Sequence, residues 1–369
     1  MPSKVCIVKC PDYSPENVDQ AIAKIFQLLN LGSLISPGQK VLLKPNLLTD
    51  TPPDKGITTH PAIIKAVAEE VKGLGASPFL GDSPGGAGVQ YSKAIDQTGM
   101  KHAGIPIVNF EESSTKGFIS KIALDADVII NMPKLKTHEL TQMTCGIKNM
   151  FGCVPGLQKV KYHFDAPRPE EFSEVLVNIF EKVRPAITIV DAVVVMEGQG
   201  PANGKLRRLN LLVASTDTVA VDAVCSRMIG YEPMEIDTTR IAYQRGLGEA
   251  DISKIEILGD KLEIFEDFQH PKYIASLLNR IPKHLNKFIK PLINIIRKRP
   301  KINKKKCVKC MICVNSCPSH AIDNKSFKIN KNKCIMCFCC RELCKYGAVD
   351  LKESILWKLL VFLKKHLMS

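Results

Sequence analysis

The sequence has no stretch that approaches the roughly 18 uncharged apolar residues of a membrane-spanning helix. It starts with a strand-like run rather than a basic segment followed by an apolar one, so we expect no signal peptide. The phosphate-binding Walker loop and the glycine fingerprint of dinucleotide-binding domains are also missing. Fibrous and disordered classes are excluded because 45% of the residues are apolar and 24% are charged. The 369 residues therefore predict two or three folded domains.

Acidic residues are scarce in the last quarter of the chain. Residues 271–369 hold 23 Lys or Arg and 4 Asp or Glu, a net charge of +19, whereas residues 1–270 hold 28 and 33, a net charge of −5. An anionic partner would therefore be drawn to the C-terminal part. Specific nucleic-acid binding is not expected, since the basic region has little aromatic interleaving and no recognition motif.

Two basic segments, residues 263–303 and 351–369, also contain recurring apolar residues. Pro282 and Pro291 interrupt the first segment, so we expect short amphipathic helices there and one more at the C-terminal end. Such helices resemble those that lie on anionic membrane surfaces. Packing of their apolar sides on the rest of the protein is the alternative. We expect a cytoplasmic protein, either free or in peripheral contact with a membrane.

Nine of the 14 cysteines lie between Cys307 and Cys344, a density that favours metal binding over disulfides in a cytoplasmic chain. They form two runs of one pattern, C-x2-C-x2-C-x3-C, displaced by 27 residues. Residues 304–350 closely resemble bacterial two-cluster ferredoxins, in which the fourth cysteine of each run serves the other cluster. The resemblance implies two 4Fe–4S clusters, one held by Cys307, Cys310, Cys313 and Cys344 and the other by Cys334, Cys337, Cys340 and Cys317.

Zinc is the alternative metal for these cysteines. A zinc site needs four ligands, and two C-x2-C pairs would supply them. Zinc does not explain a third cysteine at the same interval and a fourth after three more residues, in both runs. Cys339 is surplus to the pattern and is not assigned as a ligand.

Residues 1–262 predict an α/β domain with a mostly parallel sheet covered by helices on both faces. Short β-rich runs are expected at 5–8, 41–44, 78–81, 105–108, 128–131, 187–190, 211–214 and 255–258. Helical spacing is found at 61–71, 171–183 and 218–229. Because ligands of such sheets bind beyond the carboxyl ends of the strands, polar residues that follow strands are the candidate site.

The residues at these strand exits form motifs. They are Lys44-Pro45-Asn46, Thr59-His60-Pro61, Gly81-Asp82-Ser83-Pro84-Gly85, Pro133-Lys134-Leu135-Lys136-Thr137-His138, Gly146-Ile147-Lys148-Asn149, Asp191 with Glu197-Gly198-Gln199-Gly200-Pro201, and Asp217 with Asp222. With these motifs, residues 2–262 resemble a bacterial and archaeal domain family of unknown function, DUF362, whose members are often fused to a ferredoxin domain. The resemblance implies a fold and an association with iron–sulfur clusters, but no substrate.

The strand-exit residues predict a site for a small anion. Four lysines, Lys44, Lys134, Lys136 and Lys148, would hold it if they converge. The Gly81–Gly86 loop would add backbone N–H groups, with a plain tight turn as the alternative. Further substrate contacts are expected from the polar residues Asn46, Asp82, Ser83, Asn149, Asp191 and Glu197.

His138 is the first candidate for proton transfer, and Lys134 and Lys148 are expected to act beside it. Nearby ammonium groups disfavour its protonated form, although a structural role remains an alternative. His163 is expected in a loop and is given no role, and His60 is read as a helix-start residue. An additional divalent metal on some of the acidic residues is an open alternative.

These observations leave three hypotheses for function. In the first, the protein is an iron–sulfur oxidoreductase whose ferredoxin domain passes electrons to a small anionic substrate in the α/β domain. In the second, it is a non-enzymatic electron carrier whose α/β domain docks an acidic redox partner. In the third, it is a redox adaptor at a membrane surface.

Overall fold

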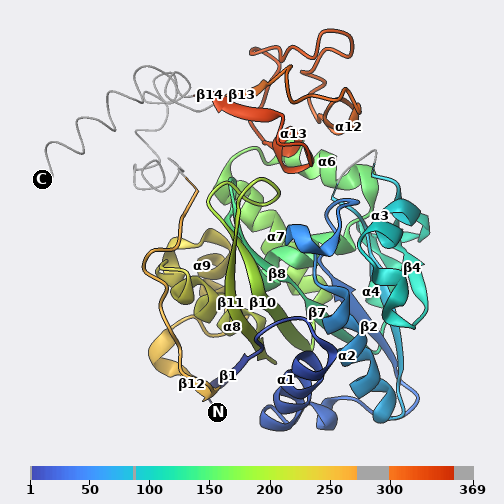
Figure 1. The fold of residues 1–369 in the computed structure, drawn as a ribbon, viewed down its shortest axis with the longest axis vertical. Helices are drawn as coiled ribbons and strands as arrows, with labels where there is room; N and C mark the ends of the chain where they lie inside the picture. The colour runs from blue at the N-terminus through green and yellow to red at the C-terminus, as the bar shows by residue number, and fades with distance from the viewer. Residues whose placement is uncertain (1, 86–88, 272–298, 353–369) are drawn as a thin grey trace, which may run out of the picture.

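The computed structural model describes residues 2–85, 89–271 and 299–352. Most of the predicted basic connector and the predicted C-terminal helix lie outside these residues. The described part consists of a large α/β domain with a small C-terminal unit on top of it (Figure 1).

The α/β domain is built on a mixed, mostly parallel sheet, as the sequence predicted. Along the sheet the strands are β12 (Ile255–Gly259), β1 (Ser3–Lys9), β11 (Lys205–Ser215), β10 (Ile187–Glu197), β7 (Val128–Met132), β2 (Lys40–Pro45), β3 (Ser77–Asp82) and β4 (Ile107–Asn109). Among these strands β11 alone runs antiparallel to both of its neighbours. Strands β10, β7, β2, β3 and β4 are parallel, so their carboxyl ends meet at one edge.

Helices cover both faces of this sheet. The side chains of a strand alternate between the two faces, and here both sets are apolar, so each face packs against helices. In β2, Val41 and Leu43 pack into the core under α1 (Pro15–Leu28) and α2 (Pro61–Gly73). Leu42 points to the opposite core. That core lies under α7 (Pro169–Val183), α8 (Thr218–Met228) and α9 (Asp237–Gln244).

Shorter elements complete the domain. The remaining helices are α3 (Tyr91–Gln97), α4 (Lys121–Leu124), α5 (Gly146–Asn149) and α6 (Gly156–Asp165), and a small hairpin is formed by β5 (Thr115–Lys116) and β6 (Ile119–Ser120). Short 3-10 segments occur at Leu31–Leu34, Pro53–Lys55, Met100–Ala103, Phe110–Glu112, Met150–Cys153, Pro233–Glu235 and Ile252–Lys254. Residues 263–271, expected in the connector, pack back on this domain, where Phe268 is buried and Gln269 accepts a hydrogen bond from the amide of Gly198.

The motif after β7 differs from the expectation. Lys134–His138 forms a further strand, β8, which pairs with β10 and with β9 (Gln142–Thr144), and all five of its residues are buried. The polar sequence of β8 concealed this strand, since buried lysines are rare unless they are paired.

A buried ion pair holds β8 to β10. Lys134 Nζ lies 2.8 Å from Asp191 Oδ2 and 2.7 Å from Tyr13 Oη, and Tyr13 donates to Asp191 Oδ1 at 2.9 Å. The backbone N–H of His60 donates to the same carboxylate. His60 is also the N-cap of α2, where its Nδ1 accepts from the amide of Ala62. The pair therefore links the start of α2 to two strands.

Removal of one partner should leave the other charged and unpaired in the interior. We expect Asp191→Ala to lower the free energy of unfolding by about 3–5 kcal/mol, measured by urea denaturation. The matched control is Asp54→Ala, because the Asp54–Lys55 pair is exposed and should contribute less than about 1 kcal/mol. Equal losses in the two variants would contradict the structural role of Asp191.

The C-terminal unit preserves the internal repeat of the sequence. Helix α12 (Ile312–Asn315) corresponds to α13 (Cys339–Glu342) after the 27-residue shift. The N–H of Ala321 donates to Cys317 Sγ, as that of Ala348 donates to Cys344 Sγ. A two-stranded sheet of β13 (Arg299–Ile302) and β14 (Val349–Lys352) closes the unit, which therefore extends beyond the expected 304–350.

Candidate functional site

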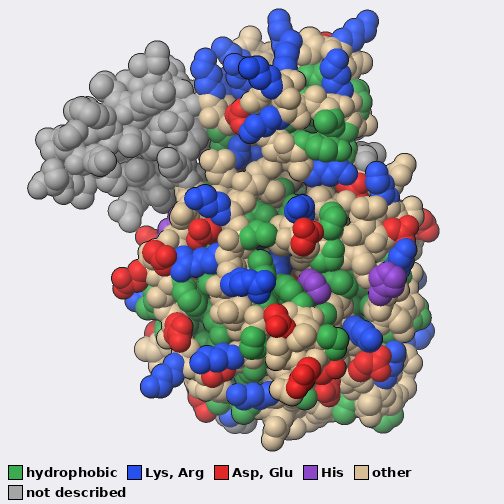
Figure 2. Space-filling view, in the orientation of Figure 1, with side chains coloured by type: hydrophobic (Ala, Val, Ile, Leu, Met, Phe, Trp, Pro, Cys, Tyr) green, Lys and Arg blue, Asp and Glu red, His purple; other side chains and the backbone are tan. Residues whose placement is uncertain are grey.

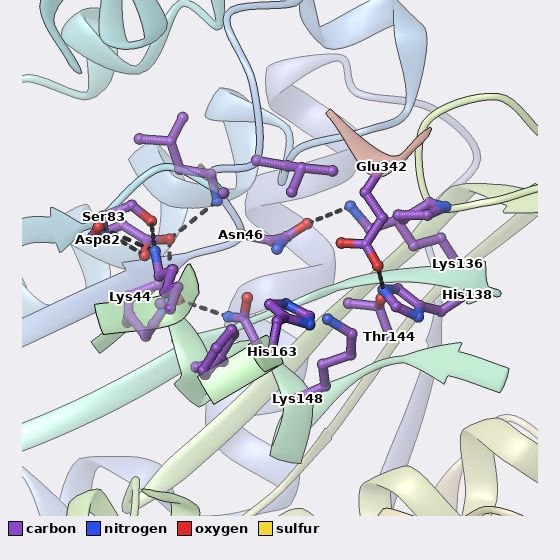
Figure 3. Close-up of a pocket in the computed structure, with 18 residues that line it drawn as sticks. Lys44, Asn46, Asp82, Ser83, Lys136, His138, Thr144, Lys148, His163 and Glu342 are labelled. Atoms are coloured by element: carbon purple, nitrogen blue, oxygen red, sulfur yellow. Dashed lines mark hydrogen bonds and ion pairs between the residues drawn. The ribbon is translucent and has the colours of Figure 1, made fainter. Parts of the chain in front are cut away.

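A pocket lies at the carboxyl ends of β2 and β3, beneath the C-terminal unit (Figure 3). Its free space is about 60 Å³, room for a few water molecules or one compact ion. Eight of the residues expected from the sequence line it: Lys44, Asn46, Asp82, Ser83, Lys136, His138, Lys148 and Asn149. These residues therefore lie together at the strand exits, and β8 and β9 supply part of the lining.

Four polar residues of the pocket were missed. They are Thr144 on β9, Lys159 and His163 on α6, and Glu342 on α13. His163 was expected in a loop without a role, but it lies on a helix, stacks on Phe172 and lines the pocket. Lys159 and His163 are four residues apart and so share one helix face, a spacing that could have been read from the sequence.

The lysines of the pocket differ in their partners. Lys44 Nζ lies 3.0 Å from Asp82 Oδ2, while Asp82 also accepts hydrogen bonds from the amides of Leu47 and Ser83. Lys136 Nζ donates to neutral oxygens, the side chain of Asn46 at 2.7 Å and the carbonyl of Ile57. Burial lowers the pKa of Lys136 well below its ordinary value, and the nearby charge of Lys148 lowers it further.

Lys159 and Lys148 also lack a carboxylate at hydrogen-bond distance among the described residues. Lys159 Nζ donates to the carbonyls of Ser83 and Pro84 and to the Ser83 hydroxyl, and burial lowers its pKa to about 8. Lys148 keeps part of its surface open to the pocket. Burial lowers the pKa of Lys148, while the negative charge of Glu342 acts in the opposite direction.

His138 and Glu342 join the two units of the protein. His138 Nε2 lies 2.7 Å from Glu342 Oε1, with both side chains buried. His138 Nδ1 accepts hydrogen bonds from the amides of Leu140 and Thr141, so the ring proton is on Nε2, the nitrogen that faces Glu342. Burial lowers the pKa of His138 to about 4, against the opposing effect of Glu342. Burial raises the pKa of Glu342, but the nearby His138 and the positive charge of Lys148 more than offset this and keep the carboxylate ionised.

Three predicted substrate contacts lie outside the pocket lining. Lys134 and Asp191 are occupied by their mutual ion pair. Glu197 accepts from the amide of Gln269 and lies 3.5 Å from Arg207. The pocket lining therefore contains Lys44, Lys136, Lys148 and Lys159, whereas Lys134, one of the four lysines named from the sequence, lies outside it.

The glycine-rich loop supplies fewer amides than expected. The N–H of Ser83 donates to Asp82 and that of Gly85 donates to the carbonyl of Leu48, so both are already used. Gly85 packs close to Leu48 and Leu343, where a Cβ would clash with the first. Residues 86–88 of the loop lie outside the described part.

The acidic residues do not gather into a site for a divalent metal. Within the described ranges no group of three or more His, Cys, Asp or Glu side chains is placed to hold a single ion. Asp217 caps α8 by accepting from the amides of Val219 and Ala220. Asp222 accepts from the amides of Gly146 and Ile147 and fixes the start of α5.

The cysteines of the C-terminal unit line two separate cavities. Cys307, Cys310, Cys313 and Cys344 line one, and Cys317, Cys334, Cys337 and Cys340 line the other. Each set combines three cysteines of one run with the fourth of the other run, as in the two-cluster ferredoxins. None of the 14 cysteines forms a disulfide. The residues present therefore fit a multi-iron cluster in each cavity, and Cys339 lines neither cavity.

The C-terminal unit is held on the α/β domain by polar contacts around Glu342. Lys345 Nζ lies 2.9 and 2.8 Å from the two carboxylate oxygens of Asp50. Arg341 donates to the side chain of Gln199 and lies 3.6 Å from Glu139. These contacts surround α13 and fix the position from which Glu342 enters the pocket.

Buried neutral histidines make the stability depend on pH. Burial lowers the pKa of His163, like that of His138, to about 4. As the pH falls below about 6.5, these histidines take up protons in the unfolded chain but stay neutral in the folded chain. The folded state is therefore most stable, with respect to these groups, above pH 6.5, and it loses stability as the pH falls toward 4. His163→Phe should reduce the slope by up to about 1.4 kcal/mol per pH unit between pH 6 and 5, measured by anaerobic urea unfolding. His102→Gln, at an exposed site, is the control, and an unchanged slope in His163→Phe would contradict the assignment.

Comparisons with known proteins agree with the sequence motifs. The model of the domain of unknown function DUF362 matches residues 41–227, and that of the 4Fe-4S binding domain matches residues 300–323. A thylakoid-associated protein of Synechocystis sp. is 37% identical over 261 residues, which cover 67% of this chain and 80% of that protein.

Among solved structures, the apoprotein of lactate racemase from Thermoanaerobacterium thermosaccharolyticum is similar, with 12% identity and a TM-score of 0.38. The similarity covers 58% of this chain and about half, 54%, of the racemase. No helix among the described residues is long and apolar enough to cross a bilayer. The family model spans the pocket residues of the α/β domain, and the second model covers the first of the two cysteine runs: the chain belongs to the DUF362 family and carries a ferredoxin-type 4Fe-4S electron-transfer domain.

Proposed function

We propose that the protein is an iron–sulfur oxidoreductase in which the ferredoxin unit passes electrons to a small anionic substrate held in the pocket. The observation that carries this proposal is the position of Glu342. It follows Cys340, which lines one cysteine cavity, by two residues and precedes Cys344, which lines the other, by two. Its carboxylate reaches the pocket and binds His138, so the pocket lies directly against the cluster-binding segment.

The cysteine cavities support two clusters rather than one. When bound, each 4Fe–4S cluster would supply or accept one electron at a time. The residues of the α/β domain have different tasks. Lys136 and Lys148 present positive charge to the substrate, and the His138–Glu342 pair holds a transferable proton on Nε2.

Cluster content tests the two-cluster assignment. Anaerobically purified protein should contain about eight iron and eight acid-labile sulfide per chain, and Cys337→Ala should reduce both to about four. Cys339→Ala is the matched control, since this neighbouring thiol lines neither cavity, and it should keep all eight. Metal and sulfide analysis is the measurement. Stoichiometric zinc without sulfide in the wild type would refute both clusters.

The redox reaction is tested by reoxidation. Protein reduced with dithionite should regain its oxidised visible spectrum when a small carboxylate or phosphate-bearing substrate is added. Lys148→Met should slow this at least about 100-fold by removing a charge from the pocket, with the clusters intact. Lys161→Met is the control, because this lysine of α6 is exposed and pairs with Asp165. Reoxidation that is unaffected by Lys148→Met would contradict a reaction in the pocket.

A second function, that of an electron carrier, is favoured by a basic groove on the ferredoxin unit. Lys and Arg side chains crowd this unit in Figure 2. The described lining of the groove includes Cys334, the acidic residue Asp350 and six lysines, Lys301, Lys304, Lys305, Lys328, Lys331 and Lys352. Such a surface suits an acidic redox protein. If the reduced protein is reoxidised by an acidic redox protein at low salt but by no small anion, this second function replaces the first.

Localisation stays a prediction. Eight cysteines kept as thiolate ligands favour the reducing environment of the cytoplasm. The thylakoid association of the Synechocystis relative is compatible with peripheral contact between this chain and an anionic membrane. The basic segments that would make such contact lie largely outside the described residues.

A further inference from the structure

We infer that the pocket binds a compact dianion that also carries a hydrogen-bond donor. Hydrogen phosphate and small hydroxydicarboxylates belong to this class. The inference rests on the proposed function in treating the pocket as the substrate site, but it concerns binding and is tested without electron transfer.

The first argument is the charge balance of the pocket lining. Four lysines, Lys44, Lys136, Lys148 and Lys159, face two carboxylates, Asp82 and Glu342. Asp82 pairs with Lys44. Glu342 contacts the neutral ring of His138, and its negative charge interacts with the positive charge of Lys148. When all these groups are ionised, two positive charges are left over in a largely buried space. Buried charge is costly unless it is paired, so a ligand of charge −2 is the one that balances the site.

The second argument is a set of buried polar atoms without partners among the described residues. Three of them are Thr144 Oγ1, Asn149 Oδ1 and His163 Nδ1; the same set contains His138 Nε2 and Glu342 Oε1, which lie 2.7 Å from each other. All three side chains are more than nine-tenths buried, and all three residues line the pocket. Such atoms are normally satisfied, which indicates that a ligand or water completes them.

Asn149 fixes the chemistry of one ligand group. Its side-chain nitrogen donates to Asn131 Oδ1 and to the carbonyl of Pro45, so the amide orientation is set and Oδ1 is a pure acceptor. A ligand that satisfies Oδ1 must bring an O–H or N–H. Thr144 Oγ1 can donate to an oxygen of the same ligand. A fully deprotonated oxoanion such as sulfate would leave Asn149 Oδ1 unpaired.

The space limits the size of the anionic group. About 60 Å³ accommodates one phosphate-sized or small dicarboxylate group and excludes a bulky organic ligand from the buried part. A monoanion would leave one lysine charge unbalanced. Burial lowers the pKa of Lys136, Lys148 and Lys159, so a dianion that stabilises their charged forms should also cause proton uptake on binding.

The test is calorimetric titration of the anaerobic, cluster-loaded full chain with four probes at constant ionic strength, which suppresses unspecific binding to surface lysines. The probes are inorganic phosphate and tartronate, both dianions with a hydroxyl near pH 7.5, sulfate, a dianion without a donor, and formate, a monoanion. We expect phosphate or tartronate to bind most tightly, and sulfate and formate each at least about 10-fold more weakly. The preferred member of the first pair identifies a phosphoryl or a dicarboxylate source.

Variants and proton uptake complete the test. Lys148→Met should weaken binding of the preferred probe by about 10-fold or more, and Lys161→Met should leave it unchanged. If Lys148→Met does not fold, Thr144→Val takes its place and should also weaken binding. Proton uptake by the wild type is then measured by repeating the titration in buffers of different ionisation heat. Tightest binding of formate, equal binding of sulfate and the preferred probe, or no saturable binding of any probe would overturn the inference.

The outcome is separable from the proposed function. Dianion binding without any reoxidation of reduced protein would leave the ligand class standing and refute the reaction. Reoxidation by a monoanion that competes with none of the dianions would support the redox reaction and refute the proposed ligand class.

Discussion

A buried carboxylate on the ferredoxin unit and a neutral histidine on the α/β domain form the contact on which the rest of the arrangement depends. Removing Glu342 from water costs several kcal/mol, and the Nε2–H of His138 together with the nearby lysines offsets that cost. The dependence is mutual, because without Glu342 the pocket lining would contain four lysines against one carboxylate. The ferredoxin unit is therefore part of the electrostatic structure of the pocket as well as its cover.

The docking contacts concentrate on one short segment, α13 and the three residues that follow it. Arg341, Glu342 and Lys345 lie within five residues and contact the α/β domain through Gln199, His138 and Asp50. The same stretch holds Cys340 and Cys344, one from each cysteine set. A change of charge in the pocket would therefore occur beside the segment that carries cysteines of both proposed clusters, and the proposed function predicts coupling between ligand binding and electron transfer.

The sequence predicted what depends on local pattern. The cysteine spacing identified the ferredoxin unit, and the short β-rich runs together with the helical spacing between them identified the α/β class. It could not predict which buried charges pair, since this depends on contacts between distant segments. Lys134 and Lys136 look equivalent in the sequence, but on strand β8 one meets Asp191 and the other reaches the pocket. Glu342 was missed for the same reason, because its partner is about 200 residues away and on another domain.

The most direct test of the account is the midpoint potential of the clusters with and without the anion bound in the pocket. Because binding and reduction are reciprocally linked, a dianion next to α13 should lower the reduction potential of at least one cluster, and reduction should weaken anion binding by the same factor. Glu342→Gln, which removes a negative charge from the same helix, should raise that potential. Potentials that are identical with and without saturating anion would show that the ferredoxin unit and the pocket are not coupled.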